Sequence, residues 1–412
     1  MNSNKPSISQ TMLFNTVGSL IYYACQWFLS VVIVRISGYE KAGVLSLAMS
    51  VTAAPAIIGL FNVRNYQASD LNNQYNQKTY INSRHITNLF SFLICAVMVL
   101  AGGYSKEKAV VILLFMLYKI AEGYADVYYG IEQRWERLDY AGISMTIRGI
   151  GTIIIFVVIL LAFDNLIIGL LAISIFSLLI VLVYDVRKTR AWCNDKIDAS
   201  QLKSEVISLL ITCIPLAIVA FLNNFAFNLA KIVLEGTYGS EVMGYYSSVA
   251  SPTLVVQLAA QTIFAPMIPP LTECFVKKDK NGFYSILKKF SCLFCGLTIV
   301  VLIGSKLLAH WGLCLLFGDK IEPYVYLFVY IVLMTIFMAI NTSLFSVCTL
   351  IREIKIQYLI GMVAIVVSVI TAYTLVVRFS MEGVIWAQTI TILSQILIQI
   401  VIIVRKLRKH FQ

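Results

Sequence analysis

Charged side chains are scarce in this sequence. Only 13% of its 412 residues are Asp, Glu, Lys or Arg, whereas 59% are hydrophobic, and the mean hydropathy is +0.83. A soluble globule of this length needs far more polar surface to cover its core. The composition therefore excludes a water-soluble protein and indicates one that resides in a lipid bilayer.

Residues that support hydrolysis or metal binding are also few. The three histidines (His85, His310 and His410) are far apart, and neither a GxSxG motif nor a phosphate-cradling glycine loop occurs. The CLFC sequence at 292–295 has metal or redox spacing, but it lies in an apolar run without a second pair, so its thiols are expected to be small apolar groups. We expect no enzyme, no ATP-driven pump, no cofactor and no metal. The short outward loops also disfavour a membrane polymerase or ligase.

Long apolar runs fill the rest of the chain. A helix needs roughly 20 apolar residues to cross about 30 Å of hydrocarbon, and twelve such runs are present. The predicted spans are 11–34, 41–63, 84–103, 108–129, 141–163, 165–186, 205–233, 241–267, 283–308, 323–350, 356–378 and 383–404. The first is expected to be a retained helix rather than a cleaved signal.

The distribution of basic residues predicts the orientation. If the N-terminus is cytoplasmic, 22 of the 32 Lys and Arg residues fall on the cytoplasmic side, seven on the other side and three within spans. Basic loops collect on the cytoplasmic side of membrane proteins. Both termini are therefore predicted to be cytoplasmic. The net charge of +11 is explained by basic loops against anionic membrane lipids, and no nucleic acid is expected.

Two similar stretches indicate an internal duplication. GYEKAGVLSLAMS (38–50) and GSEVMGYYSSVAS (239–251) share glycine, glutamate, glycine and two serines, and each starts just before the second span of its half. The hydrophilic segment 189–205 divides the spans into six and six. We therefore predict an all-α membrane protein of twelve transmembrane helices in two pseudo-symmetric six-helix bundles, an N-terminal lobe over 1–194 and a C-terminal lobe over 195–412.

Charged residues inside predicted spans are the strongest functional candidates, because an ionised group in hydrocarbon costs at least about 2.5 to 3.5 kcal/mol. Lys119, Glu122 and Asp126 share one face of the fourth span. They form either an internal ion pair that holds the bundle or the lining of a cavity, where Glu122 or Asp126 could bind a proton or cation. Arg148 in the fifth span either neutralises these acids or meets an anionic ligand.

Polar stripes mark further spans. In the seventh span the stripe reaches the outer interface, where Lys231 could instead extend its amine into the headgroups. Glutamines recur in the eighth and twelfth spans, and a stripe with Tyr22 and Gln26 runs along the first; these predict interhelical hydrogen bonds or a sugar-contacting surface. The stripe residues in the seventh and eighth spans are Asn224, Asn228, Lys231, Glu235, Gln257 and Gln261.

Three stretches resemble a known family. VVIVRISGYEKAGVLSLAMS (31–50) resembles the signature at the first outer turn of Wzx-type lipid-linked oligosaccharide flippases. These flippases belong to the multidrug/oligosaccharidyl-lipid/polysaccharide (MOP) exporter superfamily. GLFNVRNYQASD (59–70) is similar to the end of their second helix, and 239–271 is similar to the matching region of their second lobe. The likeness in topology covers essentially the whole chain, although the motifs are loose.

The resemblance implies two six-helix lobes in a V around a polar, cationic cavity. An undecaprenyl-pyrophosphate-linked oligosaccharide would there be moved from the cytoplasmic to the outer leaflet of a bacterial plasma membrane by alternating access. Arg35 and Arg64 match motif arginines, whereas Lys119, Arg148 and Lys231 are candidates from the residues alone. A polysaccharide polymerase and glycosyltransferases are the implied partners. The alternative is a cation-coupled drug or metabolite antiporter of the same superfamily, which should show a more acidic cavity.

Overall fold

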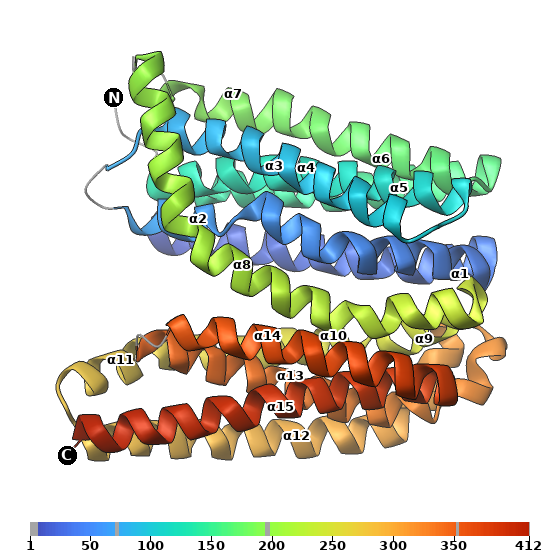
Figure 1. The fold of residues 1–412 in the computed structure, drawn as a ribbon. Helices are drawn as coiled ribbons and strands as arrows, with labels where there is room; N and C mark the ends of the chain where they lie inside the picture. The colour runs from blue at the N-terminus through green and yellow to red at the C-terminus, as the bar shows by residue number, and fades with distance from the viewer. Residues whose placement is uncertain (1–6, 71–73, 194–197, 352–353, 412) are drawn as a thin grey trace. The chain divides into compact units, whose positions relative to one another are not determined.

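The chain is helical throughout the part that the structure describes. The structure is a computed structural model, and it describes residues 7–70, 74–193, 198–351 and 354–411, in which there is no strand (Figure 1). Among these described residues, eight helices are long and apolar enough to cross a membrane. The predicted class, an all-α multi-pass membrane protein, is confirmed.

The first half of the chain supplies nine helical elements. They are α1 (Ile8–Leu60), α2 (Val63–Ser69), α3 (Gln77–Ala101), α4 (Lys106–Arg134), α5 (Leu138–Phe163), α6 (Leu166–Ile180), the π-helix η1 (Val181–Asp185), α7 (Val186–Thr189) and η2 (Arg190–Trp192).

The second half begins with the long helix α8 and ends with α15. Its elements are α8 (Ala199–Tyr238), α9 (Ser240–Ala250), α10 (Thr253–Phe264), η3 (Ala265–Met267), α11 (Ile268–Val276), α12 (Lys280–Phe317), η4 (Asp319–Tyr324), α13 (Leu327–Leu350), α14 (Ile354–Thr371), the π-helix η5 (Ala372–Val376) and α15 (Val377–Phe411).

Every predicted span coincides with helix, which is consistent with twelve crossings. Two of the eight long helices each contain two predicted spans. One is α1, in which the backbone breaks at Gly38, and the other is the continuous run of α14, η5 and α15, in which the backbone breaks at Ser380. The two remaining spans are α4, whose charged residues lower its hydropathy, and the eighth span, which is divided between the short helices α9 and α10.

The two echoed glycines hold the same backbone conformation. Gly38 has φ 85° and ψ 178°, and Gly239 has φ 87° and ψ 172°. This backbone conformation is essentially restricted to glycine, because a Cβ would crowd the peptide groups of the same residue and its chain neighbours. Each glycine ends the first helix of its half and begins the second. The shared turn is therefore a conformational match as well as a sequence match between the two halves.

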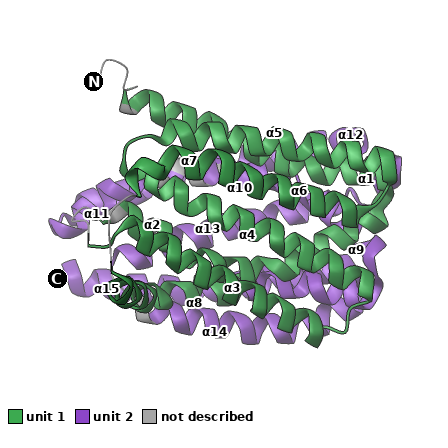
Figure 2. Cartoon of the chain, turned by 90° about the horizontal axis from the view of Figure 1, so that it is seen from above, with its two compact units in different colours: residues 1–224 green, residues 225–412 purple. Residues whose placement is uncertain are grey.

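The chain separates into two compact units, Met1–Asn224 and Phe225–Gln412 (Figure 2). The division falls within α8 rather than in the segment 189–205. The start of α8 belongs to the first unit because it is bonded there: Thr79 Oγ1 donates to Glu205 Oε2 at 2.6 Å, and the hydroxyls of Tyr75 and Ser208 are 2.9 Å apart. The grouping of spans into lobes over 1–194 and 195–412 remains a prediction.

Glycines bring α1 and α5 into close contact in the first unit. A Cβ on Gly18 would lie 2.2 Å from the carbonyl oxygen of Gly142, and a Cβ on Gly149 would lie 3.0 Å from the Cα of Tyr22. Small residues allow this approach, which contributes packing where lipid gives no hydrophobic driving force between helices. The contact fixes Tyr22 of α1 against the part of α5 that carries Arg148.

We predict that Gly38→Ala lowers the free energy of unfolding by about 1 to 3 kcal/mol, because alanine must adopt a backbone conformation that only glycine reaches without strain. The space is open, since no atom lies within 4 Å of the added Cβ, so a loss reports strain rather than a clash. Thermal unfolding of the purified protein in detergent measures it.

Gly236→Ala is the matched control. It lies in α8 three residues before Gly239 and also has no atom within 4 Å of an added Cβ, but its backbone is helical. Alanine there should be neutral or slightly stabilising. Equal midpoints for the two variants would contradict the assigned turn.

Candidate functional site

The fourth span carries an ion pair that is bonded to the first span. Lys119 Nζ lies 2.7 Å from Glu122 Oε2, and the hydroxyl of Tyr22 donates to the other oxygen of Glu122. Tyr118 joins the group, since its hydroxyl lies 3.1 Å from that of Tyr22 and accepts from Gln26 Nε2 at 2.6 Å. The internal pair and the interhelical role of the first-span stripe are both present in the structure.

Asp126 sits one helical turn further along α4 between two arginines. Arg84 Nη2 lies 2.8 Å from Asp126 Oδ2, and Arg64 Nη1 lies 3.4 Å from Oδ1. Arg84 is fully buried, and its Nη1 also donates to the carbonyl of Gly59. Asp126 is thus the carboxylate that compensates a buried guanidinium, a contact whose loss costs several kcal/mol.

Arg148 is buried without a carboxylate partner at ion-pair distance in the described residues. Its Nε donates to Ser177 Oγ and its Nη1 donates to the hydroxyl of Tyr129, both at 3.1 Å. The guanidinium also lies over the ring of Tyr22, 5.6 Å from the centroid, in a cation–π contact. Its Nη2 nitrogen has no hydrogen-bond partner among the described residues. Arg148 is therefore a buried cation with one nitrogen, Nη2, whose hydrogens meet no acceptor in the described residues.

These contacts are continuous, because Tyr22 links the Lys119–Glu122 pair to Arg148, and Tyr129 lies between Arg148 and Arg64, 5.8 Å below the Arg64 guanidinium. We call this set the charged network. It comprises Arg64, Arg84, Lys119, Glu122, Asp126 and Arg148.

The charged network has two layers and an excess of positive charge. Four cations face two carboxylates, which leaves a net charge of about +2. Lys119 and Arg64 keep 29% and 28% of their side chains exposed, whereas Arg84 and Arg148 are buried. The partly exposed cations, Lys119 and Arg64, can contact a ligand, and the buried arginines raise the local positive potential without contacting it.

The other predicted cations lie outside the charged network. Arg35 is exposed near the Gly38 turn, nine residues beyond Gln26, which is roughly 13 Å along a helix axis. Lys231 in α8 lies 5.4 Å above the ring of Phe227.

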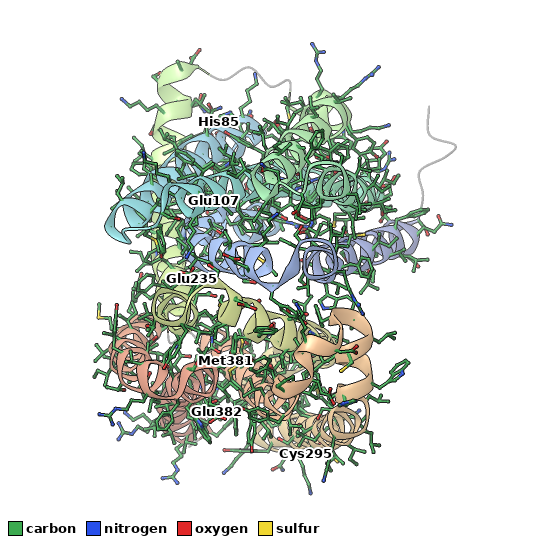
Figure 3. The ribbon with its side chains drawn as sticks, turned by 90° about the vertical axis from the view of Figure 1, so that its right-hand side faces the viewer. His85, Glu107, Glu235, Cys295, Met381 and Glu382 are labelled. Atoms are coloured by element: carbon green, nitrogen blue, oxygen red, sulfur yellow. The ribbon has the colours of Figure 1, made fainter. Side chains whose placement is uncertain are left out.

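The polar stripe of α8 is engaged along the helix. The amide of Asn224 donates to the carbonyl of Ala220 at 3.0 Å, and Asn228 lies one turn further on, half-buried. Glu235, labelled on its helix in Figure 3, accepts from Ser240 at 2.7 Å, which ties the end of α8 to the start of α9.

The second unit contains a cavity of about 250 Å³ between α10 and α13, lined in part by Gln257, Met338, Thr342 and Ser346. Gln257 donates towards the Met338 sulfur at 3.5 Å. The predicted Gln261 lies in α10, but its side chain is outside the described residues.

The glutamines of the last span form interhelical bonds. Gln388 Nε2 donates to the carbonyl of Phe227 at 2.8 Å, and Asn341 donates to Gln395 at 2.7 Å. Cys292 and Cys295 are free and exposed on α12, and Figure 3 labels Cys295. In the described ranges no group of three His, Cys, Asp or Glu is placed to hold a metal ion.

Sequence reasoning missed several members of this region. Arg84 was counted as a loop residue because its span was predicted to begin there, but α3 starts seven residues earlier, at Gln77. Glu132 was placed beyond the fourth span, yet α4 continues to Arg134. Asp185 lies inside the predicted sixth span, and an acidic residue in an apolar run is itself the signal that marks it.

The described helices define an all-α membrane protein, and comparison with known proteins shows which fold it has. The chain can be superposed on the MATE multidrug transporter DinF-BH with a TM-score of 0.69, 13% identity, and coverage of 98% of this chain and 96% of that one. The lipid II flippase MurJ, in its inward closed conformation, gives a TM-score of 0.68 with 14% identity, over 97% and 90% of the two chains. The fold is that of MOP-superfamily transporters.

Residues 8–275 match the polysaccharide biosynthesis protein family, and the chain belongs to that family. It is also 25% identical over 378 residues to the capsular polysaccharide biosynthesis protein CapF of Staphylococcus aureus, covering 91% of this chain and 93% of CapF. Family and fold together support a role as a flippase or transporter.

We predict that Asp126→Asn lowers the free energy of unfolding by roughly 3 kcal/mol, the low end for a broken buried pair because Asp126 is partly exposed. The variant leaves Arg84 buried without its carboxylate. Thermal or denaturant unfolding in detergent measures the loss.

Glu273→Gln is the control, because it removes an exposed ion pair to Lys277 on α11. Exposed pairs contribute little, so its unfolding midpoint should match the parent. If Asp126→Asn behaved like this control, the structural role of Asp126 would be wrong.

Proposed function

We propose that the protein is a flippase that moves an undecaprenyl-pyrophosphate-linked oligosaccharide from the cytoplasmic to the outer leaflet by alternating access. The observation that carries the proposal is the charged network, which places four cations and two carboxylates in the interior of the first unit. Family membership and the capsular relative support the substrate class.

The chemistry of such a substrate matches this excess charge. A pyrophosphate carries two or more negative charges, which hydrocarbon does not accommodate, whereas a polyprenyl tail can remain in lipid. Arginine and lysine form charge-assisted hydrogen bonds to phosphate oxygens. Lys119 and Arg64 would contact the headgroup, while Arg84 and Arg148 would strengthen the local positive potential.

The carboxylates of the network support a structural role. Glu122 is bonded to Lys119 and Tyr22, and Asp126 is paired with two arginines, so each carboxylate has its partners within the protein. We therefore place the sequence-predicted ion-coupling candidates, Glu122 and Asp126, as counter-ions that set the positions of the cations.

The alternative is a cation-coupled drug or metabolite antiporter. The similarity to MATE transporters in fold leaves it open, since fold alone does not define a substrate. A site for hydrophobic cations should carry an excess of acidic groups. The positive excess of the network favours an anionic substrate instead.

The proposal includes the cellular setting. The resemblance to lipid-linked oligosaccharide flippases implies a bacterial plasma membrane, and the basic loops favour both termini in the cytoplasm. Arg35 and Lys231 remain candidates for the cationic lining, and Asn224, Asn228, Gln257 and Gln261 remain candidates for contacts to the substrate. Glycosyltransferases would supply the lipid-linked unit and a polymerase would consume it.

We predict that Lys119→Gln and Arg148→Gln each reduce polysaccharide export about tenfold or more, because each removes one of about two net positive charges beside the headgroup. Surface polysaccharide in a strain lacking its own flippase, complemented with each variant, measures export, and membrane fractions report protein level.

A charge-balanced double variant separates net charge from disruption of packing. Lys119→Gln with Glu122→Gln removes one charge of each sign and keeps amides able to hydrogen bond, so the network retains its net charge. It should export more than Lys119→Gln alone. Equal polysaccharide from the parent and both single variants would contradict the proposal, as would drug efflux from cells whose polysaccharide is normal.

The orientation predicts labelling from one side only. In a background without the nine free cysteines, Lys106→Cys should react in intact cells with a membrane-impermeant maleimide, and Asp198→Cys should react only after lysis. Both positions are exposed. The reverse pattern would overturn the predicted topology.

A further inference from the structure

The first unit contains a buried carboxyl group that its neighbours do not satisfy. Glu132, near the end of α4, is 0% exposed, and neither of its side-chain oxygens has a hydrogen-bond partner among the described residues. Burying an ionised carboxylate without a partner costs several kcal/mol, so such a group takes up a proton instead.

A second carboxyl group acts on the first from another helix. Asp185 is the last residue of the π-helix η1 and is also 0% exposed; neither of its oxygens is satisfied by a well-formed hydrogen bond in the described residues, and the donor near it is the hydroxyl of Ser144 on α5. The π-helix η1 packs against α4, and this packing brings Asp185 within electrostatic reach of Glu132. Two nearby carboxylates disfavour each other's ionisation, and single-turn π-helices occur frequently at functional sites.

The charged groups around Glu132 are already engaged. Arg137 holds Asp139 through two hydrogen bonds of 2.9 and 2.8 Å, and Arg64 is paired with Asp126. These two arginines favour the charged form of Glu132, whereas Asp139 and Asp185 oppose its ionisation. Arg134, two residues further along α4, is paired with Asp70, and Glu132 makes no ion pair at contact distance in the described part of the unit.

The surroundings of Asp185 are similar. The hydroxyl of Ser144 and the guanidinium of Arg148, both on α5, favour its charged form, and three tyrosines on α4 and η1 lie near it. Arg148 is bonded to Ser177 and Tyr129 and makes no ion pair with Asp185 at contact distance. The tyrosines are Tyr128, Tyr129 and Tyr184.

We propose that Glu132 and Asp185 form a buried proton-binding site whose occupancy sets the charge available to the charged network. With both carboxyls protonated, the six-residue network keeps its net charge of about +2; with both ionised, the eight groups sum to about zero. The site is distinct from Glu122 and Asp126, which are ion-paired.

The consequence for a ligand follows from linkage. Proton binding favours an anion at the network, and anion binding favours the proton, by the same factor. One unit charge roughly 10 Å from a ligand changes its affinity by about tenfold in a medium of intermediate polarity. This part of the inference rests on the proposed anionic substrate, whereas the proton site itself does not.

Infrared spectroscopy of the full-length protein in lipid tests the site directly. At neutral pH the parent should show the carbonyl band of a buried, protonated carboxyl group, weakened in Glu132→Gln and in Asp185→Asn. Glu136→Gln, an exposed residue four positions after Glu132, is the control and should keep the band. A parent protein without this band, or a band unchanged in both variants, would overturn the proposal whether or not any variant folds poorly.

A binding titration with undecaprenyl pyrophosphate at neutral and alkaline pH tests the linkage. Affinity of the parent should fall about tenfold or more as the pair loses its protons, and the Glu132→Gln/Asp185→Asn double variant should lose less. The titration of the pyrophosphate itself is common to both proteins. Equal losses would overturn the linkage, whereas no binding by either protein at any pH would count against the proposed function and leave the infrared result standing.

Discussion

Uncompensated charge in hydrocarbon is the constraint on which the first unit depends. The six side chains of the charged network lie among its helices, and the packing of α1 to α6 supplies each with a partner. Gly18 and Gly142 let α1 approach α5 closely, so that Tyr22 can bond Glu122 and also lie beneath Arg148. The fold and the site are thus one arrangement, because helix packing and charge compensation use the same contacts.

The excess of cations connects this arrangement to transport. Two carboxylates compensate part of the positive charge, and tyrosine hydroxyls and rings accommodate the rest without cancelling it. Such a site carries favourable potential for an anion while its own groups stay ordered. A pyrophosphate head that enters this unit would supply the missing negative charge, whereas an organic cation would be repelled.

Sequence patterns predicted the fold well because they follow from bilayer thickness and backbone geometry. The twelve apolar runs coincide with helices, and the echo between 38–50 and 239–251 appears as two glycines with nearly the same φ and ψ. The Lys119–Glu122 pair was among the alternatives because a spacing of three residues places both on one helical face.

Partners from other helices could not be predicted in this way. Arg84 was not a site candidate because the predicted span begins at residue 84, whereas α3 begins seven residues earlier. Its pairing with Asp126 depends on how α3 packs against α4. Tyr22 and Gln26 were expected to form interhelical bonds, but their partners Tyr118 and Glu122 depend on helix rotation. The unsatisfied oxygens of Glu132 and Asp185 are visible only once all neighbours are placed.

The central claim, that the first unit binds the anionic head of a lipid through its charged network, is tested most directly by photo-crosslinking. A pyrophosphate lipid with a photoreactive group beside the phosphates should label peptides from α2 and α4 of the purified protein, and excess undecaprenyl pyrophosphate should prevent it. Labelling confined to peptides of the second unit, or labelling of α2 and α4 that the competitor leaves unchanged, would contradict the account.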